Sequence, residues 1–396
     1  MIKINEIKDK IFPEEIVLLN DNQILQYLNT VVSNHIKEQS YNYSIEEIKQ
    51  TVNDLFSEYR GFGILDKFLE SNEINEIMIN SFNEIYLEKN GMIVKSDHNF
   101  SNTDEYMRII QKMVSESGRE VNLSNPIVDI NLEDGSRVNI VLNPISRDNP
   151  VVTIRKFSDK TLRIGQLINF NTLNIIAARF ISELVKSKYN IMIGGGTSSG
   201  KTTFLNALSE FISKEERIIT IEDSRELKLI EIENWISLES RQANSSNKGE
   251  ITIKDLIKNS LRMRPDRIIV GEVRADETLD MLQAMNTGHD GSISTAHANS
   301  SRDMISRLET MVLRSSDNIP IEAVKRMINS SIEIIIQLKR VSLSKRRVVE
   351  ISEVLQDENG KTLINKIFEY NYKTDTLEKT GDLVNREKLM RWKNDK

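Results

Sequence analysis

Residues 195–202 read Gly-Gly-Thr-Ser-Ser-Gly-Lys-Thr and match the phosphate-binding pattern G-x-x-x-x-G-K-[ST] at every fixed position. In a chain of 396 residues, a chance match has a probability on the order of one to two percent. The apolar run Ile191-Met192-Ile193 precedes the pattern, and residues 204–212 follow it with the apolar spacing of one helix face. A strand, a glycine-rich loop and a helix in this order predict a P-loop in an α/β domain.

Such a loop binds phosphate through its backbone and two side chains. Its glycines let N–H groups turn toward phosphate oxygens, and the helix adds the positive end of its dipole. We expect Lys201 to reach the β- and γ-phosphates and the Thr202 hydroxyl to ligate Mg²⁺. The sequence therefore predicts ATP and Mg²⁺ as ligands, bound by Gly195, Gly196, Thr197, Ser198, Ser199, Gly200, Lys201, Thr202 and Thr203.

Three apolar or β-branched runs after the loop each end in polar side chains. They are residues 218–221, 267–270 and 292–295. Ligands of open α/β sheets bind outside the carboxyl ends of the strands, so we expect the polar groups that follow these runs to gather beside the loop.

These polar groups have different expected roles. Glu272 is the first candidate to orient or deprotonate the attacking water, and Glu226 is the second. Glu222 is expected to support Mg²⁺, through water, and His297 to sense the γ-phosphate. His289 and His297 are not expected to form a zinc site, because the chain has no cysteine and only 4 histidines.

The pattern of the remaining chain predicts an α/β P-loop domain preceded by a small α+β domain and an N-terminal helical segment. A capping box at Ser44 and Glu47 marks a helix in the first part. Asn90-Gly91 lies between two apolar runs and predicts a β-hairpin. The predicted divisions are a helical segment at 1–60, an α+β domain at 61–155, a linker at 156–163 and the P-loop domain at 164–396.

Composition narrows the classes of function. The chain has 53 Lys and Arg against 59 Asp and Glu, a net charge of −6, and the N-terminus lacks the apolar run of a signal peptide. We therefore expect a cytoplasmic protein whose contact with a membrane is peripheral, and no nucleic-acid partner. The basic segment 339–347 is interpreted as a solvated loop between two strands, with lipid or partner contact as the alternative.

With these motifs in place, the chain resembles the ATPases of type II and type IV secretion systems, most closely the Tad/Flp pilus assembly branch typified by CpaF. The resemblance rests on the P-loop, on TIEDSRE at residues 220–226 and on residues 261–299, which contain a Walker B-like strand and a His box. It extends back to RGFGILDKF at residues 60–68 and covers roughly residues 60–355. One departure is Ser198, where the family commonly has Gly.

The resemblance implies that the P-loop domain is a RecA-like P-loop NTPase motor domain. It also implies a homohexameric motor that binds ATP at the domain interface and acts on an integral membrane platform protein. It also implies that Arg137, in SRVNIVLNP, and Arg155, in TIRKF, reach the phosphates from the N-terminal domain. The expected function is ATP hydrolysis that powers pilus assembly or protein secretion across the cytoplasmic membrane. The alternatives are a RecA-like nucleic-acid motor and a nucleotide-binding scaffold without turnover.

Overall fold

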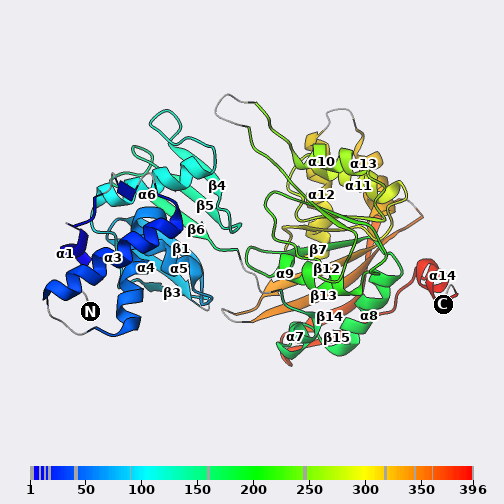
Figure 1. Ribbon diagram of the computed structural model, residues 1–396. Coiled ribbons are helices and arrows are strands. Elements are labelled where there is room, and N and C mark those ends of the chain that lie inside the picture. Colours follow the sequence, from blue (N-terminus) through cyan, green and yellow to red (C-terminus); the bar gives the residue numbers. More distant parts are fainter. Residues whose placement is uncertain are drawn as a thin grey trace. The chain divides into compact units, whose positions relative to one another are not determined.

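The computed structural model describes residues 4–8, 10–12, 15–16, 19–39, 43–89, 91–157, 161–243, 248–315, 319–342, 345–358 and 360–394. The chain divides into two compact units, Met1–Ser158 and Asp159–Lys396 (Figure 1). The predicted linker at 156–163 spans this division, and its residues Ser158, Asp159 and Lys160 lie outside the described residues. No helix of the described part is long and apolar enough to cross a membrane.

The first unit combines helices with one antiparallel sheet. The sheet has the order β3-β2-β1-β6-β5-β4, and every neighbouring pair is antiparallel. Its elements are α1 (Ile4–Lys8), α3 (Asp21–Gln39), α4 (Ile45–Arg60), α5 (Ile64–Glu70), β1 (Ile74–Ser81), β2 (Glu84–Lys89), β3 (Met92–Lys95), α6 (Thr103–Glu116), β4 (Ile127–Asn131), β5 (Arg137–Val141) and β6 (Val151–Arg155).

Two local sequence signals of this unit are confirmed. At the start of α4, the Glu47 N–H donates to Ser44 Oγ over 3.2 Å and the Ser44 N–H donates to Glu47 Oε2 over 3.0 Å, which is the predicted capping box. The predicted hairpin is the β2–β3 pair, with Leu87 opposite Val94; Asn90 of its turn lies outside the described residues. Helices α1, α3 and α4 enclose a core of their own, separate from the core under the sheet.

The second unit is a nine-stranded sheet in the order β15-β14-β13-β12-β7-β11-β10-β8-β9. The strands from β12 to β9 in this order are parallel to their neighbours, whereas β13, β14 and β15 add to the sheet antiparallel. The elements are α7 (Ile164–Asn169), α8 (Ile175–Lys186), β7 (Ile191–Gly195), α9 (Lys201–Leu208), the 3₁₀ helix η1 (Ser209–Phe211), β8 (Ile218–Glu222), β9 (Trp235–Glu239), α10 (Ile253–Ser260), β10 (Arg267–Val270), α11 (Glu277–Asn286), β11 (Ile293–Ala296), α12 (Ser301–Ser315), α13 (Ile321–Ser331), β12 (Ile334–Arg340), β13 (Arg346–Gln356), β14 (Thr362–Asn371), β15 (Thr376–Lys379) and α14 (Glu387–Asn394).

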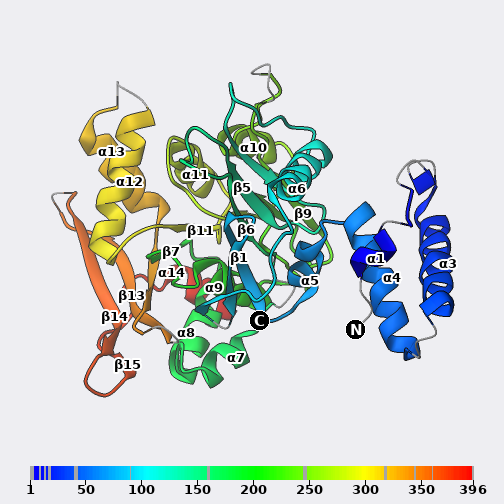
Figure 2. The same cartoon turned by 90° about the vertical axis from the view of Figure 1, so that its left-hand side faces the viewer.

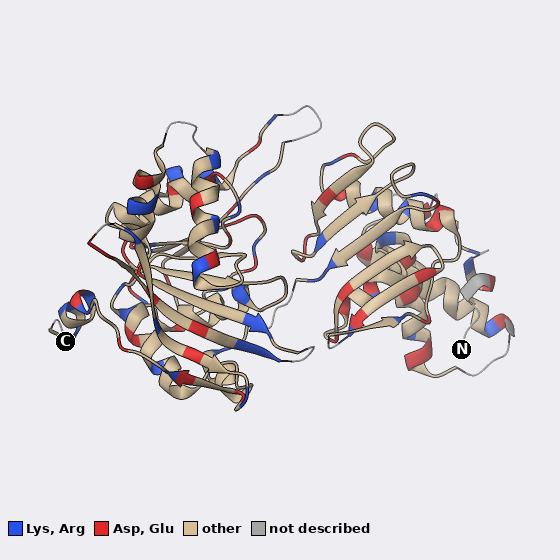
Figure 3. Ribbon diagram, turned by 180° about the vertical axis from the view of Figure 1, so that it is seen from behind, with Lys and Arg blue, Asp and Glu red and all other residues tan. Residues whose placement is uncertain are grey.

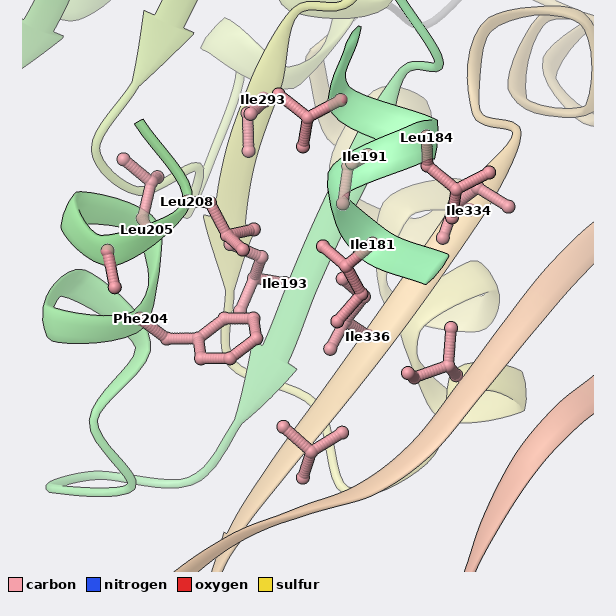
Figure 4. Packing of buried hydrophobic residues seen from close by; sticks show 14 of the residues in the cluster. Ile181, Leu184, Ile191, Ile193, Phe204, Leu205, Leu208, Ile293, Ile334 and Ile336 are labelled. Atoms are coloured by element: carbon pink, nitrogen blue, oxygen red, sulfur yellow. The ribbon is translucent and has the colours of Figure 1, made fainter. Parts of the chain in front are cut away.

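Helices cover both faces of the parallel strands, so these strands read as continuous apolar runs. Helices α7, α8 and α9 pack on one face (Figure 4), where Ile193 of β7 and Ile336 of β12 meet Phe204 of α9 and Ile181 of α8. Helices α10 to α13 pack on the other face (Figure 2). The α/β fold predicted around the P-loop is confirmed.

One sequence interpretation is wrong in part. The basic segment 339–347 is not all loop, because Lys339 and Arg340 end β12 and pair across the ladder with Arg347 and Arg346, which open β13. Arg347 is only 5% exposed and donates from Nε to Asp375 Oδ1 over 3.1 Å. A carboxylate from the β14–β15 turn thus lets a basic residue extend a buried strand.

Candidate nucleotide site

The P-loop connects β7 to α9, as the sequence predicted. Lys201 is the first residue of α9, and Gly200 before it has φ of 93°, a left-handed conformation that glycine adopts without strain. Gly195 is required for a different reason, because a Cβ atom there would lie 2.4 Å from Ser199 Oγ and 2.7 Å from the Leu338 carbonyl oxygen. The glycines of the pattern therefore meet steric demands of the loop itself.

Lys201 points back over the loop. Its ammonium donates to the carbonyl oxygens of Gly195, over 3.2 Å, and Gly196, over 3.4 Å. Its Nζ also lies 3.7 Å from Glu272 Oε1. Burial lowers the pKa of the Lys201 ammonium, and the charge of Glu272 opposes that shift. Phosphate oxygens would be stronger acceptors for this cation than the two loop carbonyls.

Glu272 follows β10 and lies at the centre of a charged cluster. Arg274 donates to Glu272 Oε2 twice, from Nε over 2.8 Å and from Nη2 over 2.6 Å. On the other oxygen, His297 Nε2 lies 3.0 Å from Glu272 Oε1. Burial lowers the pKa of His297. The charge of Glu272 opposes this shift, but the charges of Lys201 and Arg274 add to it, so the neutral imidazole is favoured. The fold thus brings together Lys201 at the start of α9, Glu272 after the end of β10 and His297 after the end of β11.

Glu222 and Glu226 lie on the turn after β8. Glu222 is 3% exposed, and its Oε1 accepts from the backbone N–H groups of Glu226, over 2.9 Å, and Leu227, over 3.0 Å. Its Cγ would lie only 2.9 Å from a Cβ atom on Gly271. The Glu222 carboxylate therefore organises this turn. The negative charge of Glu226 acts on Lys201 instead, where it raises the pKa of the ammonium and so opposes the effect of burial.

The oxygen donors here suit Mg²⁺ of a nucleotide complex. Magnesium in P-loop proteins keeps several waters and takes few protein ligands besides the phosphates. No group of three or more His, Asp or Glu side chains in the described ranges could form a closed metal cage. Thr202 and Glu222 supply oxygen atoms of the kind that Mg²⁺ prefers, and their roles as its ligands stay predictions, because Glu222 Oε1 already accepts from two backbone N–H groups.

Arg137 and Arg155 lie in the first unit, on neighbouring strands. They are directly opposite each other in the β5–β6 ladder, and Arg155 is also opposite Glu76 of β1. Like charges in directly opposite positions repel and destabilise a strand pair. The sheet therefore brings two guanidinium groups together where β5 begins and β6 ends.

Sequence reasoning did not single out Arg274, Asp223 and Arg346. Arg274 also contacts Asp223, with Nη1 3.4 Å from Asp223 Oδ2, and so joins the ends of β10 and β8. Arg346 donates from Nε to the Ser198 carbonyl oxygen over 3.3 Å. The position of Arg274 two residues after Glu272 was the only sequence signal for its role, and Arg346 has none, since 148 residues separate it from Ser198.

Comparison with known proteins places the chain in a family. The sequence profile of type II/IV secretion system proteins matches residues 58–377. An uncharacterised protein of Methanocaldococcus jannaschii is 38% identical over 303 residues, and the match covers 74% of this chain but only 40% of that protein. The type IV secretion system protein VirB11 of Bartonella quintana is 30% identical over 323 residues, covering 72% of this chain and 90% of that protein.

Among solved structures, the pilus retraction motor PilT with bound ADP has a similar fold, with a TM-score of 0.53 and 20% identity over 84% of this chain and 87% of that one. The secretion-system profile extends across most of the residues described above, from α4 to β15. The chain therefore belongs to the family of type II/IV secretion system proteins.

Proposed function

We propose that the chain is an ATPase that powers a secretion or pilus machine, and that Tad/Flp pilus assembly is its specific use. The observation that carries the proposal is the P-loop lysine, Lys201, held 3.7 Å from the Glu272 carboxylate at the ends of parallel strands. A cation for phosphates and a carboxylate for water are the two parts that ATP hydrolysis needs side by side. A scaffold without turnover would not need the second part.

The residues divide the chemistry among them. Lys201 exchanges its loop carbonyls for the β- and γ-phosphate oxygens, which frees Glu272 from the ammonium. Glu272 then orients the attacking water and accepts its proton, with Arg274 holding the other carboxylate oxygen in place. Neutral His297 offers a hydrogen bond near the reacting group. Thr202 would hold a nucleotide-bound Mg²⁺, and the ion would supply neutralisation of the phosphate charge.

The partners follow from this assignment. The motor is a cytoplasmic homohexamer, peripherally associated with the cytoplasmic membrane, and it transmits movement to an integral membrane platform protein. The overall charge of −6 disfavours binding to the phosphate backbone of a nucleic acid. The basic residues at the ends of β12 and β13 offer a local surface for contact with protein or lipid.

The class of machine is tested by what stimulates hydrolysis. We expect vesicles containing an anionic phospholipid to raise the steady-state ATPase rate of the full chain at least about twofold, because peripheral contact at a basic surface is electrostatic. Single-stranded DNA at equal charge concentration is the matched control and is expected to leave the rate unchanged. Stimulation by DNA and not by the vesicles would contradict the proposal and favour a nucleic-acid motor.

Arg137 and Arg155 are proposed to act on the nucleotide phosphates. Their cross-strand position supports this, because two guanidinium groups in opposite positions can both donate forked hydrogen bonds to one anion. We expect Arg137→Ala or Arg155→Ala to lower kcat/KM for ATP more than about tenfold, or about 1.4 kcal/mol, with Lys a poor substitute. Steady-state phosphate release measures the effect.

The control for these variants is Arg147→Ala, which removes an exposed arginine from the loop between β5 and β6 of the same unit. An equally large loss in Arg147→Ala, or full activity in both strand variants, would show that the two arginines do not take part in the chemistry.

A further inference from the structure

The end of the β12–β13 hairpin lies beside the P-loop. β12 runs parallel to β7 with Leu338 opposite Gly195, the last residue of β7. β12 then continues for Lys339 and Arg340, and Arg346 of β13 pairs opposite Arg340. The two strands therefore carry their basic residues past the point where β7 turns into the loop (Figure 3).

Arg346 spans the outer side of the loop. Its Nε donates to the Ser198 carbonyl oxygen over 3.3 Å. Its Cδ lies 3.9 Å from the position that a Cβ atom on Gly200 would take, so the aliphatic stem runs over Gly200 while the head reaches Ser198. One side chain thus contacts two of the positions that give the loop its shape.

Those two positions are the left-handed ones. Ser198 has φ of 56° and Gly200 has φ of 93°. Glycine adopts this conformation freely, but a residue with a Cβ atom does so at a cost of roughly 1–2 kcal/mol. Ser198 is also exposed, so no packing around its side chain compels the conformation. Two hydrogen bonds resist rotation of the peptide between Ser198 and Ser199. The Ser199 N–H donates to the Gly196 carbonyl oxygen over 3.3 Å, and Arg346 Nε donates to the Ser198 carbonyl oxygen.

We propose that Arg346 is a positioning residue that holds Ser198 in the left-handed conformation and keeps the P-loop ready to bind nucleotide. This inference rests on the proposed ATP site. When the loop relaxes, its N–H groups no longer converge on the phosphates. The apparent affinity for nucleotide then falls in proportion to the fraction of molecules whose loop can still bind. A glycine at 198 would make the conformation inexpensive and remove the need for Arg346.

A double-mutant cycle on the full chain tests the proposal. The probe is ATP with a methylanthraniloyl fluorophore on the ribose, titrated with Mg²⁺ present, and the readout is its Kd. In the Ser198 chain, we expect Arg346→Ala to raise Kd about threefold to tenfold, the range for loss of one solvent-facing hydrogen bond. In the Ser198→Gly chain, the same substitution is expected to change Kd less than about twofold. Arg346→Lys, which retains a donor, is expected to restore part of the affinity.

The control is Lys339→Ala, which removes a cation from the same hairpin. Lys339 Nζ lies 3.5 Å from Tyr372 Oη and 5.5 Å from the centre of that ring. Its loss is expected to leave Kd unchanged, and the thermal midpoint of each variant shows that the fold is retained.

Three outcomes overturn the proposal. The first is an equal loss of affinity from Arg346→Ala in the Ser198 chain and in the Ser198→Gly chain, which indicates that Arg346 contacts the nucleotide directly. The others are an unchanged Kd in Arg346→Ala, and a loss of affinity in Lys339→Ala as large as that in Arg346→Ala. Failure of the ATP site itself is a separate result, because Lys201→Ala would then bind the probe as well as the natural chain does.

Discussion

Lys201→Ala is expected to abolish ATP hydrolysis in a chain that keeps its fold. The side chain is 10% exposed and lies between the carbonyl oxygens of the loop and the Glu272 carboxylate. Removing one preorganised group that stabilises charge in the transition state typically costs at least about a hundredfold in rate, or about 2.7 kcal/mol. The fold survives because Glu272 keeps its two hydrogen bonds from Arg274.

Phosphate release under saturating Mg-ATP measures this effect, and thermal unfolding confirms the folded state. Lys214→Ala is the matched control, because Lys214 pairs with Glu231 over 2.8 Å in the same unit and its side chain is 66% exposed. We expect its activity to equal that of the natural chain. Substantial turnover by folded Lys201→Ala would refute the nucleotide site.

Glu272→Gln is expected to retain ATP binding and to lose hydrolysis. Glutamine has nearly the same size and can still accept hydrogen bonds from Arg274, so the surroundings of the P-loop change little. The amide cannot take a proton from water, and loss of a general base costs about 10²–10⁴ in rate. We therefore expect kcat to fall at least about a hundredfold while Kd for ATP stays within about threefold.

Titration with a fluorescent ATP analogue and single-turnover phosphate release separate these two quantities. Glu226→Gln is the comparison variant, because Glu226 is the second candidate for the base and its carboxylate also raises the pKa of Lys201. An active Glu272→Gln beside an inactive Glu226→Gln would reverse the ranking of the two carboxylates. Equal loss of binding and turnover in Glu272→Gln would assign Glu272 a structural role.

Features of this protein that depend on neighbouring residues could be predicted from the amino-acid sequence. The P-loop is one, because the turn, the glycine positions and the first residue of α9 are all set within residues 195–202. The capping box at Ser44 and the β2–β3 hairpin are others. In each case, the hydrogen bonds that form the feature join residues only a few positions apart, so composition and spacing carry the information.

Contacts between distant segments were decided by the tertiary structure. Sequence patterns placed Glu222, Glu226 and Glu272 at strand ends, but only the sheet order shows that Glu272 faces Lys201 while Glu222 binds backbone N–H groups of its own turn. The same holds for Arg347, which pairs with Asp375, and for Arg346, which reaches Ser198. Periodicity reports which face of a strand is buried, but the partner of a charged group is chosen by how strands and turns meet in space.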